Sequence, residues 1–107
     1  MKSTQSINWY IKQEVDYIQV DLSGSLTRDT LFPLWEQRHS FLSTELCNTI
    51  HWNLSDIDVI DSAGLALLVE LLHLYHTKNN RLINLPQSVS DLAILFGLED
   101  WLISFKL

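Results

Sequence analysis

The stretch VIDSAGLALLVELLHLYH, residues 59–76, joins a predicted strand to an unusually apolar helix. Asp61 and Ser62 stand at the junction, and both are residue types that cap helices by accepting a backbone N–H. We therefore expect a helix from Ser62 to about Thr77. At 100° per residue, one side of it gathers Gly64, Leu67, Leu68, Leu71, Leu74 and Tyr75, and this side is predicted to face a sheet.

The opposite side of this helix carries a stripe that is predicted to face solvent: Ser62, Ala66, Val69, Glu70 and His73. The stripe is small and apolar where it begins, and it turns polar only at Glu70 and His73. Two interpretations are open. Either a flat partner rests on this stripe, or Ala66 and Val69 are ordinary exposed apolar residues of the kind that protein surfaces carry in quantity.

Ser62 has three possible roles. It could cap the helix, which is worth about 1 kcal/mol, but Asp61 could do so equally well, leaving one of the two residues free. A phosphate on Ser62 would meet the favourable end of the helix dipole and could switch a docking surface by its charge. Catalysis is disfavoured, because Ile60 stands where a nucleophile elbow requires glycine, and only folding could supply a base from His39, His51, His73 or His76.

A metal or cofactor site is not expected. Glu70, His73 and His76 follow helical spacings of three, but they are too few for a complete metal site, and a solvated polar face explains them better. Ser23-Gly24-Ser25 is a turn with one glycine and no lysine, so it is not a phosphate-binding loop.

The remaining elements follow from hydrophobic periodicity. Residues 7–13 and 16–24 alternate and predict an antiparallel edge hairpin, and residues 30–46 approximate helical spacing. A third strand contains Ile50, Trp52 and Leu54 and ends near Ser55, and a fourth, interior strand covers residues 81–85. A last helix begins at a capping box of Ser88 and Asp91 and ends at Gly97. The prediction is an α/β fold with a mixed, mostly parallel four-stranded sheet, an antiparallel N-terminal edge hairpin and about three helices.

Length and composition fit one domain over residues 1–107, with a flexible segment 1–6 and an apolar tail 99–107 that we expect to pack on the core. The net charge of −6 disfavours nucleic acid and anionic membrane surfaces as partners and suits a basic protein. The single Cys47 excludes an internal disulfide. We see neither a signal peptide nor an apolar run long enough to span a membrane, so we expect a cytoplasmic protein.

The junction VIDSAGLALLVEL resembles the signature of the STAS domain family of anti-sigma factor antagonists, in which Asp-Ser or Asp-Thr, a small residue and Gly open a helix. The resemblance covers about residues 7–98 and implies the STAS fold. LFPLWEQRH, residues 31–39, and SDLAILFGLED, residues 90–100, resemble more narrowly the STAS subunits of phospholipid-transporting ABC transporters.

The narrower resemblance implies a non-enzymatic cytoplasmic subunit at the inner membrane. Such a subunit binds and stabilises or activates the transporter's ATPase subunit, and the transporter maintains outer-membrane lipid asymmetry. The partner-binding residues are then Asp61, Ser62, Ala63, Ala66, Val69 and His73. The alternative is an anti-sigma factor antagonist that is switched by phosphorylation of Ser62.

Overall fold

The structure is a computed structural model that describes residues 6–45 and 47–107. Its strands are β1 (Ile7–Gln13), β2 (Ile18–Leu26), β3 (Thr49–Ile60) and β4 (Asn79–Ile83). Its helices are α1 (Phe32–Glu36), α2 (Ser62–Leu74), α3 (Gln87–Leu95) and α4 (Glu99–Ile103). The expected flexible segment 1–6 lies, apart from Ser6, outside the described residues.

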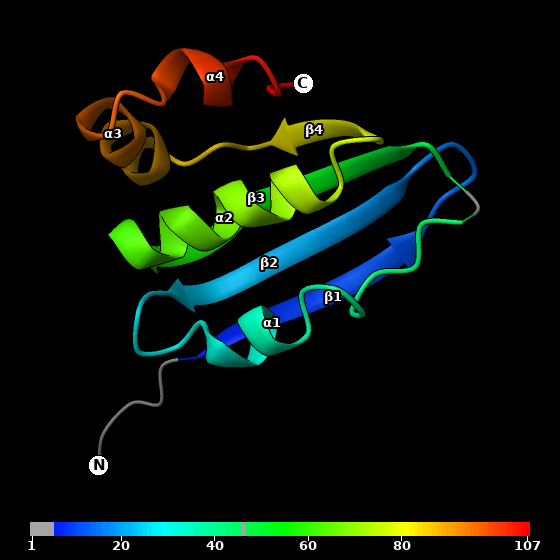
Figure 1. The fold of residues 1–107 in the computed structure, drawn as a ribbon, viewed down its shortest axis with the longest axis horizontal. Helices are drawn as coiled ribbons and strands as arrows, with labels where there is room; N and C mark the ends of the chain where they lie inside the picture. Colours follow the sequence, from blue (N-terminus) through cyan, green and yellow to red (C-terminus); the bar gives the residue numbers. More distant parts are fainter. Residues whose placement is uncertain (1–5, 46) are drawn as a thin grey trace.

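The four strands form one mixed sheet in the order β1-β2-β3-β4, and Figure 1 shows α2 lying along one of its faces. β1 pairs with β2 antiparallel, whereas β2 with β3 and β3 with β4 are parallel. The predicted α/β class, the mixed sheet and the N-terminal edge hairpin are therefore confirmed. The described residues form four helices, one more than expected.

The core lies between the sheet and α2, because alternate residues of the strands point to the same face. Val20 and Leu22 of β2, Trp52 of β3, and Leu68 and Leu71 of α2 are all fully buried. The predicted sheet-facing side of α2 is confirmed for Gly64, Leu67, Leu68 and Leu71, but Leu65 and Leu72 are buried as well.

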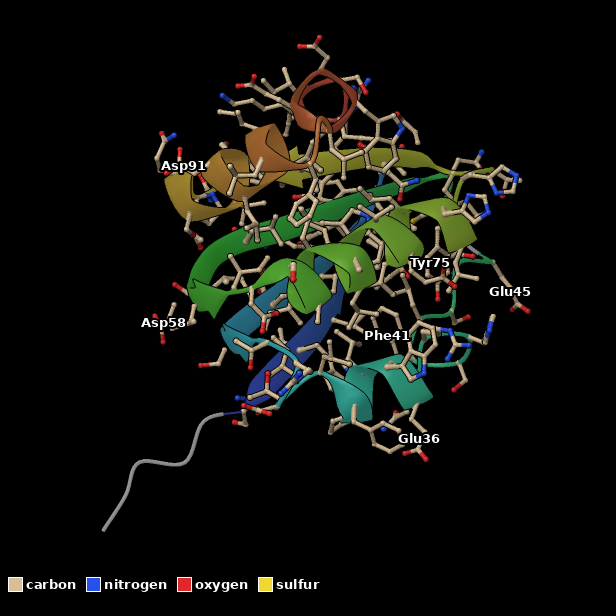
Figure 2. All side chains as sticks on the ribbon, turned by 60° about the vertical axis from the view of Figure 1, so that its left-hand side comes forward. Glu36, Phe41, Glu45, Asp58, Tyr75 and Asp91 are labelled. Atoms are coloured by element: carbon tan, nitrogen blue, oxygen red, sulfur yellow. The ribbon has the colours of Figure 1, made fainter. Side chains whose placement is uncertain are left out.

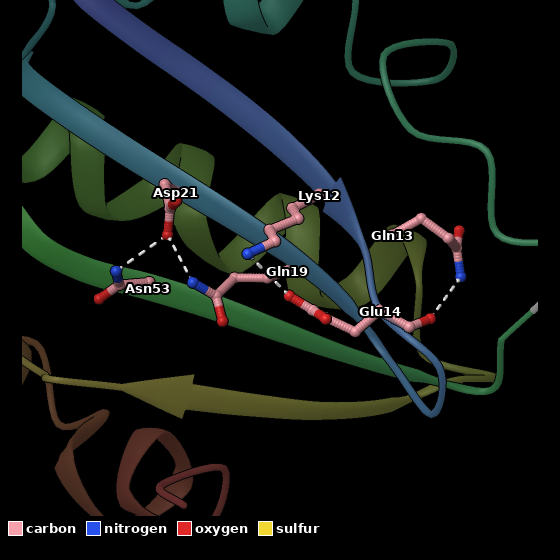
Figure 3. A network of polar contacts seen from close by, with 6 residues as sticks. All are labelled: Lys12, Gln13, Glu14, Gln19, Asp21 and Asn53. Atoms are coloured by element: carbon pink, nitrogen blue, oxygen red, sulfur yellow. Dashed lines mark hydrogen bonds and ion pairs between the residues drawn. The ribbon is translucent and has the colours of Figure 1, made fainter.

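The other face of the sheet is polar. There Gln19 and Asn53 both donate to the Asp21 carboxylate, at 3.0 and 2.9 Å, and Lys12 forms an ion pair with Glu14 at 3.2 Å (Figure 3). Because α2 covers only the apolar face, the sheet has one covered side and one side occupied by this hydrogen-bonded network.

The helix predicted for residues 30–46 is wrong over most of its length, and Leu46 lies outside the described residues. α1 covers only Phe32–Glu36, with Pro33 in its first turn, and the chain then continues in turns and bends. The apolar spacing was read correctly but assigned to the wrong structure. Leu34 and Leu42 are buried, and Phe41 packs on Trp52 and Tyr75 with ring centroids 6.3 and 6.2 Å apart.

The ends of three predicted strands also need correction. β2 covers Ile18–Leu26 instead of residues 16–24. β3 does not stop near Ser55 but continues to Ile60, because its backbone goes on pairing with β2 as far as Leu26 opposite Ile60. β4 is an edge strand rather than an interior one. It covers Asn79–Ile83 instead of residues 81–85, and only Leu82 is bridged on its outer side, by Lys106.

The helix boundaries are partly as predicted. α2 begins at Ser62 as expected but ends at Leu74, where Asn80 donates to the Tyr75 carbonyl oxygen at 2.8 Å. The capping box at Ser88 is wrong. Pro86 occupies the N-cap of α3, and Asp91 accepts from the Gln87 side chain instead.

Gly97 ends the third helix as predicted. Its φ of +69° is a conformation that favours glycine, and it turns the chain into α4. The segment after Gly97 packs on the domain, because Leu102 is buried and Phe105 contacts the core. Trp101 and Ile103 nevertheless stay partly exposed.

Candidate functional site

The start of α2 is capped by Asp61. The Asp61 backbone is extended, and its two carboxylate oxygens accept the backbone N–H groups of Gly64 at 2.9 Å and of Arg28 at 3.0 Å. One carboxylate thus satisfies an unpaired N–H of the first helical turn and also fixes the loop between β2 and α1 to the helix. Of the two capping residues at the junction, Asp61 takes this role.

The environment of Asp61 lowers the pKa of its carboxyl group. Burial alone would raise this pKa, but backbone N–H groups, those of Arg28 and Gly64 foremost, hydrogen-bond to the charged form and outweigh that effect. Asp61 is therefore a charged acceptor at neutral pH and is already engaged within the fold. Among the predicted partner-binding residues, Asp61 therefore holds the first turn of α2 in place through hydrogen bonds within the fold.

Gly64 lets the helix approach β2 more closely than any other residue would. A Cβ atom placed on Gly64 would collide with the Leu26 carbonyl oxygen. The same oxygen accepts the backbone N–H of Asp61 at 3.3 Å. The first turn of α2 is consequently fixed against the end of β2, which leaves its outer side in a defined position.

Ser62 lies on that outer side and is exposed. Within the part of the chain that the structure describes, no other group makes a hydrogen bond with its hydroxyl. Ala66, one turn further, is also exposed, whereas Ala63 and Val69 are half-buried. The structure therefore brings four of the predicted residues together in a small, weakly polar surface at the start of α2. His73 is exposed but lies three turns away.

A cavity of about 310 Å³ opens beside this surface. Its lining combines α2 with the turn between α3 and α4: Ser62, Leu65, Ala66, Val69, Phe96 and Leu98. Leu65, Phe96 and Leu98 were not among the site residues predicted from the sequence. One signal was available, because Phe96 and Leu98 flank the glycine that reverses the chain after α3, and a helix turn with apolar residues on both sides needs something to contact.

The polar half of the stripe is covered in part by the segment after α1. Arg38 approaches Glu70 with 3.7 Å between Nε and Oε2, and its guanidinium stacks on the Trp35 ring at 3.5 Å. His73 and His76 stack with ring centroids 5.7 Å apart. Among the described residues no group of three or more His, Cys, Asp or Glu side chains could hold a metal ion.

Two of the four imidazoles that could serve a catalytic Ser62, those of His73 and His51, are distant from it. His73 is eleven residues further along the helix, which corresponds to about 16 Å of axial rise. His51 stands near the start of β3, whereas Ser62 follows its end. Neither can act as the base of a nucleophilic Ser62 in this arrangement.

The fold and the Asp-Ser-Ala-Gly junction together define the class of the protein. Residues 11–104 match the family model described as "Mlab, STAS domain", and the chain belongs to this STAS family. It is 42% identical over 103 residues to the intermembrane phospholipid transport system binding protein MlaB of Haemophilus influenzae. The aligned region covers 92% of this chain and 98% of that protein. The MlaB protein of Escherichia coli is 37% identical over 79 residues, which is 72% of this chain and 77% of the relative.

Solved structures share the fold at low sequence identity. An anti-sigma factor antagonist from Mycobacterium paratuberculosis superposes with a TM-score of 0.73 at 18% identity, over 94% of this chain and 86% of that one. Unphosphorylated SpoIIAA, also an anti-sigma factor antagonist, gives a TM-score of 0.63 at 20% identity, over 88% and 84%. These likenesses establish the STAS fold for the chain.

Proposed function

We propose that this protein is a non-enzymatic subunit of an intermembrane phospholipid transport system that maintains outer-membrane lipid asymmetry. In this proposal it binds the ATPase subunit of the ABC transporter and stabilises or activates it. The similarity to two MlaB proteins, whose names place them in such a system, supports the transport role. The proposed docking residues are those that the sequence suggested, and Ser62 stands at the start of the surface that they form.

The observation that carries the proposal is the division of labour between Asp61 and Ser62. Asp61 already caps α2, so the fold does not need the Ser62 hydroxyl, which is exposed at the start of a small, weakly polar surface. A surface of this kind, fixed from below by Gly64 and Asp61, can be matched by a partner with little loss of conformational entropy.

The proposed location is the cytoplasmic side of the inner membrane, reached through the transporter complex. None of the helices in residues 6–45 and 47–107 is long and apolar enough to cross a membrane. The net charge of −6 argues against nucleic acid and anionic lipid as direct partners.

Co-purification with the ATPase subunit tests the proposal. Ser62→Arg should abolish the co-purification, because a long charged side chain would stand in the middle of the contact, whereas Ser62→Thr should preserve it. Ser43→Arg is the matched control, since Ser43 is also exposed but lies in the loop after α1. Retention of the ATPase subunit by a folded Ser62→Arg variant would reject this surface.

Phosphorylation of Ser62 is proposed only as a way to regulate the same contact. A phosphate would add about −1.5 to −2 charges beside the Asp61 carboxylate and would oppose docking on a flat surface. Ser62→Glu should then weaken co-purification, and intact mass measurement on protein from its own cells should detect a phosphorylated species. If no growth condition yields such a species, the regulatory role is wrong and the docking role is unaffected.

A further inference from the structure

The surface at Ser62 continues into an apolar groove between α2 and the turn that joins α3 to α4. Phe96 and Leu98 form one wall, and Leu65, Ala66 and Val69 form the other. Beyond Phe96, which is 55% exposed, the neighbouring Ile94 and Leu95 of α3 are 51% and 77% exposed. An apolar surface of this extent around a cavity indicates a binding site for another molecule.

Unpaired carboxylates surround this end of the molecule. Asp58 near the end of β3 and Asp91 on α3 both lie on the same side of the molecule (Figure 2), and both are exposed. Glu99 and Asp100 directly follow Leu98 of the groove. None of these four carboxylates forms an ion pair with any described residue. The two ion pairs among the described residues join Lys12 with Glu14 and Arg38 with Glu70.

Several basic side chains lie toward the opposite end. Lys78 directly precedes β4, Arg81 lies within it, and Lys12 lies near the end of β1, which pairs with the start of β2. Lys106 is bridged to Leu82 of β4, and Arg38 is occupied by Glu70 and the Trp35 ring. Arg28 is the exception, because its backbone N–H donates to Asp61 beside Ser62. The groove is therefore apolar within, and the four carboxylates named above, which we call its acidic rim, lie at the same end of the molecule, so its occupant should be apolar with basic flanks.

We propose that this groove takes the apolar face of a basic amphipathic helix, with its lysine or arginine side chains directed at the acidic rim. A groove between two helical elements fits a helix whose apolar residues recur at i, i+3, i+4 and i+7. The inference rests on the proposed function in one respect: the ATPase subunit supplies this helix.

The charge pattern disfavours two other occupants. A second copy of this chain seated symmetrically on the groove would place the same acidic rim against itself, and like charges across an interface are costly. An anionic membrane surface would be repelled for the same reason. Both remain measurable outcomes of the test.

A direct test uses the isotope-labelled full chain and a synthetic leucine-lysine helix peptide, followed by amide chemical shifts. The peptide should shift the amides of Ser62, Ala66 and Gly97, and the same peptide with glutamate for every lysine should not bind. Phe96→Ser should weaken binding about tenfold, the effect of losing one large apolar contact. Phe32→Ser is the matched control, because Phe32 is 60% exposed on α1 and should leave binding unchanged.

The following outcomes would show that the groove does not bind a basic amphipathic helix. Equal binding of the glutamate peptide, or equal weakening by Phe96→Ser and Phe32→Ser, overturns the proposal. So does sedimentation that shows a dimer lost in Phe96→Ser, or adsorption to phosphatidylglycerol vesicles lost in that variant. Circular dichroism verifies that the variants fold. Asp58→Lys together with Asp91→Lys, both at exposed positions, should weaken binding of the lysine peptide without altering the residues that line the groove.

Co-purification separates the two proposals. If Ser62→Arg releases the ATPase subunit and Phe96→Ser retains it fully, the groove inference is wrong and the proposed function stands. If the ATPase subunit never co-purifies but the lysine peptide binds as described, the proposed function is wrong and the chemistry of the groove stands.

Discussion

The two ends of α2 are built in opposite ways. At its start, the backbone is fixed to β2 and to the loop after it through Gly64, Asp61 and Arg28, and the outer side carries only the small residues Ser62 and Ala66. At its end, the outer side is covered in part, because Arg38 reaches Glu70 and the Tyr75 hydroxyl donates to the Arg38 carbonyl oxygen, although His73 stays exposed. The backbone is fixed at the start of α2, and the outer side is partly covered at the end of the helix, so only the start combines a fixed backbone with small, exposed side chains.

The strongest test of this comparison is Gly64→Ala. In an ordinary helix interior this change stabilises by about 1 kcal/mol. Here the new Cβ would meet the Leu26 carbonyl oxygen, so we expect a loss of about 3 kcal/mol in the free energy of unfolding. Urea unfolding followed by circular dichroism measures it.

Gly97→Ala serves as the control for that experiment. A Cβ on Gly97 meets nothing within 4 Å, so only its φ of +69° is penalised, at a cost of about 1 kcal/mol. Equal losses at the two glycines would contradict the close approach of α2 to β2.

The next largest effect separates Asp61 from Ser62. Asp61→Ala removes the acceptor of two backbone N–H groups and should lower the free energy of unfolding by about 2 kcal/mol. Ser62→Ala should change it by less than about 0.5 kcal/mol, because the hydroxyl is exposed and the cap is already made. Thermal unfolding of both variants decides whether the cap has been assigned to the correct residue.

A smaller effect is expected at the covered end. The Arg38 and Glu70 pair is long and partly exposed, so the coupling energy from a double-mutant cycle with Arg38→Met and Glu70→Gln should be about 0.5 kcal/mol. A coupling above about 2 kcal/mol would mean that this end is held as firmly as the start of the helix.

The smallest effect is a pH dependence at the start of α2. The folded-state pKa of Asp61 lies below its ordinary value of 3.8, so its stabilising contribution is complete well above that value and is lost as the pH falls through the folded pKa. The stability difference between the wild type and Asp61→Asn should thus be constant near neutral pH and shrink in acid. A difference that grows in acid would reverse the assigned direction.

Local sequence signals were enough to predict the start of α2. The segment after α1 and the groove depend on long-range packing, which such signals do not contain. Asp61, Ser62 and Gly64 lie within one turn of each other, so their types alone indicated the helix start and its exposed serine. The segment after Gln37 could not be assigned in this way. Its apolar residues have helical spacing, but the chain is irregular there, and it still buries Leu42 and half-buries Phe41. The groove was missed for the same reason, since Leu65 and Phe96 meet only in three dimensions.

The last residues of the chain have a practical consequence for anyone who modifies this protein. Leu82 of β4 donates its N–H to the Phe105 carbonyl oxygen, and its own carbonyl oxygen accepts from the Leu107 N–H. Trimming residues 105–107 would uncover a strand edge that can recruit a neighbouring chain, so truncated preparations should aggregate. An affinity tag fused after Leu107 would keep these residues in place. It would begin beside β4, on a different element from Ser62, so it should leave the Ser62 surface free during purification.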